Sequence, residues 1–182
     1  MVEIFDWLIF NGLVALNPGD PSGWCYVTER GRAAADDQGL MRHHASSLLS
    51  NPLHHLIEQR VRSQFLLGEY EAAVLLAFQE VEIRVRDLGG FSTSTIGVHL
   101  MRQAFKPDGG TLTDPSLDPG EQVATMELFA GAIGAFKNPS SHRQVDYGDA
   151  SIAAEAVLFA DLLLRILDRY DPALQTSAAP SS

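Results

Sequence analysis

A single apolar stripe of helical period, between residues 69 and 88, limits the fold of this chain more than any other feature. Apolar side chains recur there at steps of three and four residues, the spacing that places them on one face of an α-helix. The stripe consists of Tyr70, Ala73, Val74, Ala77, Phe78, Val81, Val85 and Leu88. Gly89 and Gly90 follow, and glycine commonly ends a helix. A helix with such a stripe must bury it against other elements, so the sequence predicts a helical bundle.

Three more segments carry comparable patterns and complete the expected bundle. Helices are predicted at about residues 51–68, 119–137 and 148–169, with a shorter helix at 95–105. Asn51 suits the cap and Pro52 the first turn of the earliest helix. The polar loop 106–120 is rich in proline and glycine and is long, and such loops are usually functional or mobile. We therefore expect a mainly α-helical domain, a four-helix bundle with one additional short helix, over residues 51–171.

Residues 1–35 follow a different pattern, in which a short amphipathic helix precedes two brief apolar runs. The runs lie on either side of a turn rich in proline and glycine, which predicts a β-hairpin. This order resembles the second half of a winged-helix domain, whose usual earlier helices are missing here. The resemblance rests on Gly12-Leu13-Val14 and on Thr28-Glu29-Arg30-Gly31. Since Arg30 and Arg32 are too few for a DNA footprint, we expect packing or partner contact from this segment, with DNA contact as the alternative.

Two further segments are not expected to belong to a packed core. Residues 36–50 change character, with alanines, serines and the pair His43-His44, and are predicted to be a linker. Residues 172–182 end in serine, alanine and proline and are predicted to form a disordered tail.

The net charge and the composition of the chain argue against several classes of function. A net charge of −10 argues against a protein that coats nucleic acid with a broad basic surface, although a local basic cleft is compatible with it. No apolar run reaches the roughly 18 residues that would suggest a membrane span. The first residues include Glu3 and Asp6 and no basic group, unlike a secretory signal. We therefore expect a cytoplasmic protein without membrane contact.

The cysteine and histidine residues are not spaced like the ligands of a metal ion. Cys25 is the single cysteine, so it cannot form an internal disulfide, and a buried thiol is expected. The pairs His43-His44 and His54-His55 have no acidic or thiol partner at ligand spacing. Neither a metal ion nor another cofactor is expected.

The segment Lys137-Asn138-Pro139-Ser140-Ser141-His142 joins two of the predicted long helices and carries chemistry. Pro139 disfavours helical geometry at Asn138, so the helix is predicted to end at Lys137 or Asn138. The break would let Lys137 and His142 lie on one side of the bundle end, where a cation and a proton-transfer group could act together. The plainer alternatives are a helix-end charge for Lys137, a helix cap for Asn138 and a surface hydrogen bond for His142.

A basic residue, a polar residue and, five positions after the first, a histidine between the last two long helices resemble the HEPN superfamily. Within it, the chain looks similar to a bacterial Ymh-like family over about residues 51–170. Four segments carry the resemblance besides this motif: Tyr70-Glu71-Ala72-Ala73-Val74, Glu82-Ile83-Arg84-Val85-Arg86, Leu100-Met101-Arg102-Gln103-Ala104-Phe105 and Phe129-Ala130-Gly131-Ala132-Ile133-Gly134-Ala135-Phe136. Lys137 departs from the arginine usual in the superfamily, keeping the charge and losing the planar fork.

The resemblance implies a metal-independent endoribonuclease, commonly a symmetric dimer, of toxin–antitoxin or anti-phage systems. His142 would help to remove the proton of an RNA 2′-hydroxyl, which attacks the neighbouring phosphate. Lys137 would stabilise the phosphoryl charge, and Asn138 would position the phosphate or His142. The products would be a 2′,3′-cyclic phosphate and a 5′-hydroxyl. Expected partners are RNA, a second copy of the chain and an antitoxin or defence protein.

The ribonuclease hypothesis also assigns roles to charged residues outside the motif. Substrate contacts are predicted for Arg143, Arg102 and Lys106. Solvent-facing ion pairs are expected for Glu82, Arg84 and Arg86, with placement at the site as the alternative.

The competing hypothesis is a catalytically inactive module that dimerises and binds a partner, with a residual DNA-associated role for the N-terminal segment. The acidic charge and the lysine at position 137 favour it.

Overall fold

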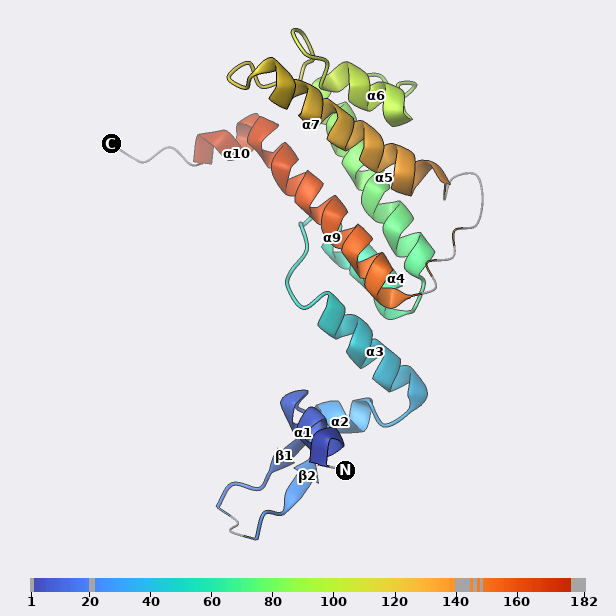
Figure 1. Ribbon diagram of the computed structural model, residues 1–182, viewed down its shortest axis with the longest axis vertical. Helices are drawn as coiled ribbons and strands as arrows, with labels where there is room; N and C mark the ends of the chain where they lie inside the picture. Colours follow the sequence, from blue (N-terminus) through green and yellow to red (C-terminus); the bar gives the residue numbers. More distant parts are fainter. Residues whose placement is uncertain (1, 20–21, 140–144, 146, 148, 178–182) are drawn as a thin grey trace, which may run out of the picture. The chain divides into compact units, whose positions relative to one another are not determined.

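The computed structural model describes residues 2–19, 22–139, 145, 147 and 149–177. The described chain is mainly helical and includes a small two-stranded sheet (Figure 1). It divides into two compact units, Met1–Leu48 and Leu49–Ser182.

The first unit begins with the predicted helix and hairpin. It contains α1 (Val2–Phe10), β1 (Val14–Leu16), β2 (Cys25–Val27), α2 (Glu29–Ala33) and α3 (Asp37–Leu48). The strands pair antiparallel with Val14 opposite Val27. The hydroxyl of Thr28 donates to the Gly12 carbonyl (2.7 Å) and accepts from the Gly31 amide (3.0 Å). One side chain thus caps α2 and ties it to Gly12, in the turn that follows α1.

Two expectations for this unit differ from the structure. Most of the predicted linker is helix α3, whose first turn is capped by Asp36, since its carboxylate accepts from the Gly39 amide (2.6 Å). Its polar composition hides the few buried positions, such as Ala45. Cys25, expected to be buried, is exposed, as are the other two residues of β2.

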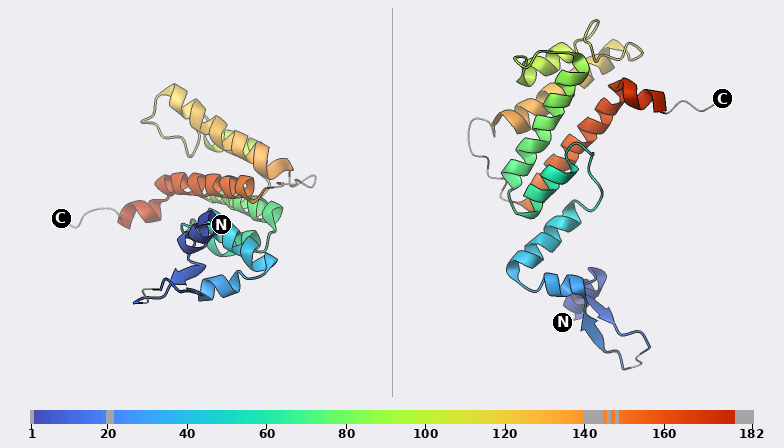
Figure 2. Two further views of the ribbon diagram at one scale, coloured as in Figure 1. Left: turned by 60° about the horizontal axis from the view of Figure 1, so that its bottom comes forward. Right: turned by 180° about the vertical axis from the view of Figure 1, so that it is seen from behind.

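The second unit is built around the long helix that the apolar stripe predicts. Its elements are α4 (Glu58–Leu66), α5 (Tyr70–Gly89), α6 (Gly97–Ala104), α7 (Pro119–Ala132), the π-helical turn η1 (Ile133–Lys137), α9 (Ala150–Leu167), the 3₁₀ turn η2 (Asp168–Tyr170) and α10 (Pro172–Ser177). Helix α5 contacts α4, α6, α9 and η1, and both views of Figure 2 show α5 and α9 side by side. The stripe is the core of this unit, because Val74, Phe78 and Val81 are fully buried.

Aromatic rings join the helices of the second unit. Phe78 of α5 stacks on Phe136 of η1 with ring centroids 4.9 Å apart. Phe105, just after α6, stacks on Phe129 of α7 at 4.4 Å. Phe78, Phe105 and Phe129 are fully buried and Phe136 is half-buried. Each fully buried ring contributes on the order of 2–3 kcal/mol of burial free energy, so these stacks help to hold η1 and α7 against α5 and α6.

The first helix of this unit begins later than predicted, at Glu58 rather than near Asn51. Hydrogen bonds to Glu58 and to α9 engage the backbone of the preceding residues. The Leu53 amide donates to the Glu58 carboxylate (2.6 Å), the His54 amide donates to Asp161 of α9, and Arg165 donates to the Pro52 carbonyl (3.1 Å). Of these groups only the Pro52 carbonyl would be paired inside a helix that began near Asn51, because the first amides of a helix have no intrahelical partner.

The end of the described chain also differs from expectation, because residues 172–177 of the predicted tail form α10. The Asp171 carboxylate accepts from the Ala173 amide (2.9 Å), and Pro172 occupies the first helical position, so the local sequence supports a helix start. No helix in the described part of the chain is both long and apolar enough to cross a membrane.

Candidate functional site

The π-helical turn η1 ends at Lys137, within the predicted bounds, but the backbone at Asn138 is helical, so the non-helical geometry predicted for this residue is wrong. Asn138 has φ −62° and ψ −44°, and its amide donates to the Ile133 carbonyl five residues back. Pro139 lacks an amide hydrogen, and in a regular α-helix its ring would clash with the carbonyl of Ala135. A π-helical turn widens the backbone spiral by one residue just before the proline. We attribute the continued helical geometry to this wider turn, which shifts the Ala135 carbonyl away from the ring.

The end of η1 presents Lys137 to a buried carboxylate. Lys137 Nζ lies 3.3 Å from Glu82 Oε2, and the two side chains are 16% and 7% exposed. Arg86 Nη2 donates to Glu82 Oε1 (2.6 Å), and the Gly97 amide donates to Glu82 Oε2 (2.9 Å). We call Glu82, Arg86, Gly97 and Lys137 the Glu82 cluster. It joins α5, the first residue of α6 and the last residue of η1.

Glu82 and Arg86 therefore do not form the solvent-facing pair that the sequence predicts. They are one turn apart on α5, beside the buried positions Val81 and Val85, and they face α6 and η1. Arg86 Nε also donates to the Thr95 carbonyl (3.1 Å). The sequence signal for this placement is the position of both charges next to the apolar stripe. That signal is weak, because the sequence does not show which elements pack against this side of the helix.

Glycines allow η1 and the start of α6 to approach one another. Gly97 has φ +65°, a conformation that favours glycine, and a Cβ added to it would lie 3.8 Å from Asn138 Oδ1. A Cβ added to Gly134 would lie only 3.3 Å from Val98 Cγ2. Asn138 is half-buried next to Gly97, so Lys137 and Asn138 both border the start of α6.

One predicted catalytic residue and one predicted substrate contact lie outside the described residues. These are His142 and Arg143. The chain is described again at Val145, whose amide donates to Glu71 Oε1 (2.8 Å) in the first turn of α5. Glu71 and Glu82 are eleven residues apart on one helix, which corresponds to roughly 16 Å along its axis. Lys137, the last residue of η1, thus lies in the Glu82 cluster, and Val145 lies near the beginning of α5.

The other predicted substrate contacts are not next to Lys137. Arg102 is exposed and lies 3.4 Å from Glu127 of α7, and Lys106 is exposed just after α6. Gly97 at the opposite end of α6 adjoins the Glu82 cluster. Arg102 lies five positions after Gly97 on α6, about 7.5 Å along the helix axis, and Lys106 follows the end of this helix. The structure thus places Lys137 and Asn138 beside the start of α6, Arg102 near the end of this helix and Lys106 just after it.

A second polar cluster, not predicted from the sequence, ties the two ends of this unit together. His54 is only 5% exposed and its Nε2 lies 3.2 Å from Asp168 Oδ1. Arg84 of α5 pairs with Asp171, and this hydrogen bond lowers the pKa of the Asp171 carboxyl. No described group of three or more His, Cys, Asp or Glu residues is arranged to hold a metal ion.

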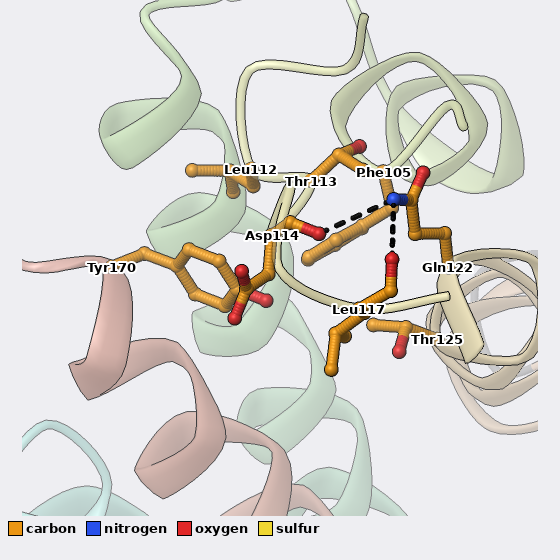
Figure 3. Close-up of a pocket in the computed structure, with 8 residues that line it drawn as sticks. All are labelled: Phe105, Leu112, Thr113, Asp114, Leu117, Gln122, Thr125 and Tyr170. Atoms are coloured by element: carbon orange, nitrogen blue, oxygen red, sulfur yellow. Dashed lines mark hydrogen bonds between the residues drawn. The ribbon is translucent and has the colours of Figure 1, made fainter. Parts of the chain in front are cut away.

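The loop before α7 is tied down by one buried side chain. Gln122 Nε2 donates to the Leu117 carbonyl (3.0 Å), and Gln122 Oε1 accepts from the Asp108 amide (3.3 Å). Figure 3 shows Gln122 beneath this loop, with Tyr170 on the far side of Asp114. Burial raises the pKa of the Tyr170 hydroxyl, and the charge of Asp114 raises it further. This pocket holds no convergent basic groups and is a weaker candidate for phosphate chemistry than the Glu82 cluster.

Comparison with known proteins gives one match. The family described as "Protein of unknown function (Hypoth_ymh)" matches residues 51–167, which lie in the second unit. Neither the curated proteins nor the solved structures contain a match to the chain.

Proposed function

The chain belongs to the Hypoth_ymh family, whose function is unknown, and we propose that it is a metal-independent endoribonuclease of the HEPN type. The observation that carries the proposal is the pairing of Lys137 with the buried carboxylate of Glu82, beside Asn138 and at the start of the segment that contains His142. A cation held in one place next to a histidine-bearing segment suits the cleavage of a phosphodiester.

The proposed reaction assigns one role to each residue of the motif. His142 accepts the proton of an RNA 2′-hydroxyl, and the 2′-oxygen attacks the adjacent phosphorus. Lys137 stabilises the negative charge that develops on the phosphoryl oxygens, and Asn138 orients the phosphate or His142. The bond from phosphorus to the 5′-oxygen breaks, and this oxygen takes a proton from water. The products are a 2′,3′-cyclic phosphate and a 5′-hydroxyl.

The setting of Lys137 supports a catalytic role despite the missing guanidinium. A free lysine is a point charge on a flexible stem, which makes it a poor substitute for arginine at a phosphate. The Glu82 carboxylate restricts that stem, so less conformational entropy is lost when a phosphate binds. Arg86 shares the same carboxylate, so the three charged groups comprise two cations and one anion.

The biological setting follows from the same proposal. We propose that the protein acts on RNA in the cytoplasm as a homodimer, in a toxin–antitoxin or anti-phage system, with an antitoxin or defence protein as its partner. Arg143 would add a cation beside His142, while Arg102 and Lys106 would contact RNA further from the cleaved bond.

The direct test is cleavage of end-labelled single-stranded RNA by the purified full chain in the presence of EDTA. We expect 2′,3′-cyclic phosphate ends, a loss of about 10²- to 10⁴-fold in His142→Ala and a loss of about 10²- to 10³-fold in Lys137→Ala. The matched control is Arg60→Ala, which removes an exposed cation from α4. Equal cleavage by the wild type and His142→Ala would remove His142 from the mechanism.

A second candidate function is a catalytically silent module that dimerises and binds a partner. The observation that favours it is the exposure of large apolar side chains in the first unit. Phe10 is 90% exposed, Trp24 is 72% exposed and Ile4 is 68% exposed. Exposed apolar surface marks a protein–protein interaction site where such side chains form a contiguous patch. This function predicts association that depends on these residues and no RNA cleavage by the wild type.

A further inference from the structure

We infer that Glu82 is the positioning residue of this site, and that its carboxylate sets where the Lys137 ammonium meets a substrate phosphate. The inference rests on the proposed function, because it names the group that prepares the proposed phosphate-binding cation. Glu82 does not itself contact the substrate, since both of its oxygens are already engaged by the protein.

The geometry around Glu82 divides its two oxygens between separate tasks. Oε1 accepts from Arg86, one turn further along the same helix, so the carboxylate is oriented from within α5. Oε2 faces outward from α5, where it accepts from the Gly97 amide and lies next to Lys137 Nζ. The position of the ammonium therefore depends on α5 and on the start of α6, as well as on the backbone of Lys137.

The burial of Glu82 indicates a specific purpose for a charge at this position. Transfer of a carboxylate from water to a protein interior costs several kcal/mol, and replacing a buried ion pair by apolar residues is often neutral or stabilising. Val81 and Val85 on the neighbouring positions of α5 are fully buried apolar residues. Packing alone would thus be served by an apolar residue at position 82. A carboxylate there does what an apolar residue cannot, because it attracts and directs a cation.

Arg86 keeps the carboxylate occupied when Lys137 engages a phosphate. Its guanidinium is held by Glu82 and by the Thr95 carbonyl, at the end of the loop between α5 and α6. Lys137 is the last residue of the π-helical turn, and its ammonium lies 3.3 Å from the carboxylate. The arrangement lets a phosphate oxygen share the Lys137 ammonium without leaving Glu82 as an unpaired buried charge.

Substitution of Glu82 by glutamine removes this function while keeping the shape. The amide would face donors on both sides: one of its groups must meet Arg86, and the other must meet Gly97 and Lys137. Whichever way it turns, its NH₂ group faces another donor. The matched control is Glu80→Gln, also on α5, whose carboxylate pairs with the exposed Arg60 at 3.3 Å.

The experiment is a double-mutant cycle on Glu82→Gln and Lys137→Ala, read by single-turnover RNA cleavage, with thermal unfolding measured alongside. We expect Glu82→Gln to slow cleavage about 10- to 100-fold and Glu80→Gln to leave the rate unchanged. If Glu82 acts through Lys137, the double variant is no slower than Lys137→Ala alone. Losses that multiply in the double variant, or a Glu82→Gln enzyme as fast as the control, overturn the inference, because a structural role would reduce every background equally.

If Glu82→Gln does not fold, Glu82→Asp keeps the charge and withdraws it by about one methylene. It must slow cleavage in the wild-type background and have no effect in the Lys137→Ala background. If the wild type cleaves no RNA, the proposed function fails, and the same cycle is read by the affinity for inorganic phosphate. Coupling between the two sites in phosphate affinity then supports the positioning role by itself. Additive effects, or no phosphate binding, overturn it.

Discussion

The ammonium of Lys137 lies 3.3 Å from a carboxylate oxygen of Glu82, a residue on a different helix and only 6% exposed. The pair connects the last residue of η1 to the middle of α5, so the position of Lys137 depends on the packing of the second unit. Long-range positioning of this kind distinguishes Lys137 from an ordinary charge at a helix end, which would need only the helix dipole.

Lys137→Arg should increase RNA cleavage if Lys137 contacts the phosphate. A guanidinium can hold Glu82 with one nitrogen and a phosphate oxygen with another, whereas the ammonium offers a single charge centre. We expect a gain on the order of a few-fold in the single-turnover rate, with the KM for RNA lowered. Lys137→Met is the control, since it keeps the length of the side chain and removes the charge. Equal rates for the arginine and methionine variants would contradict a phosphate contact.

Gly97→Ala should destabilise the second unit through its backbone. Gly97 has φ +65°, and a non-glycine residue in the left-handed region costs about 1–2 kcal/mol. Gly131→Ala is the matched control, because Gly131 lies within α7 with open space around it. That substitution should stabilise the protein by about 0.5–1 kcal/mol. Urea unfolding measures both changes, and a decrease of the same size in the two variants would contradict the explanation.

The helices of the second unit could be predicted well wherever the apolar pattern decides the fold. The stripe that contains Val74, Phe78 and Val81 predicts α5 nearly to its ends, and Gly90 ends the helix in the left-handed conformation. Such a pattern depends only on the neighbouring residues and on a partner surface of any kind. It needs no knowledge of which helix packs where.

The rest depends on partners that are distant in the sequence. The chain before α4 is fixed by Asp161, which accepts from the His54 amide more than one hundred residues away. The helical geometry of Asn138 depends on the π-helical turn before it, in which Phe136 stacks on Phe78. The spacing of Glu82 and Arg86 predicts an ion pair on the helix surface. Glu82 is buried, and its carboxylate also contacts the Gly97 amide and Lys137, which are distant in the sequence. Local propensity cannot predict these contacts.

The exposed apolar side chains of the first unit predict self-association through that unit. The double variant Phe10→Ser and Trp24→Ser removes the two most exposed large aromatic rings of the described chain. In sedimentation velocity, we expect the wild type to contain a larger species that this variant lacks. The control is Leu67→Ser, which removes an apolar side chain that is 66% exposed in the second unit. Identical sedimentation of all three proteins would contradict an interface at these residues.

The stability of the second unit should decrease at alkaline pH through Tyr170. Burial, followed by the charge of Asp114, raises the pKa of its hydroxyl above the ordinary value of 10.0, so the folded state favours the neutral phenol. The unfolded chain therefore releases this proton first as the pH rises. The stabilising contribution is complete below about pH 10 and is lost as the pH rises through the higher pKa of the folded state.

Tyr170→Phe keeps the ring, whose edge lies against Phe105 with centroids 6.1 Å apart, and removes the ionisable group. We expect the free energy of unfolding of this variant to decline less steeply above pH 10 than that of the wild type. Urea titrations at a series of pH values measure the slope, and Tyr26→Phe on the exposed strand β2 is the control. Because the phenol is only partly desolvated, the difference in slope should be smaller than one proton per molecule. A wild-type slope that Tyr170→Phe leaves unchanged would show that the hydroxyl ionises equally in both states.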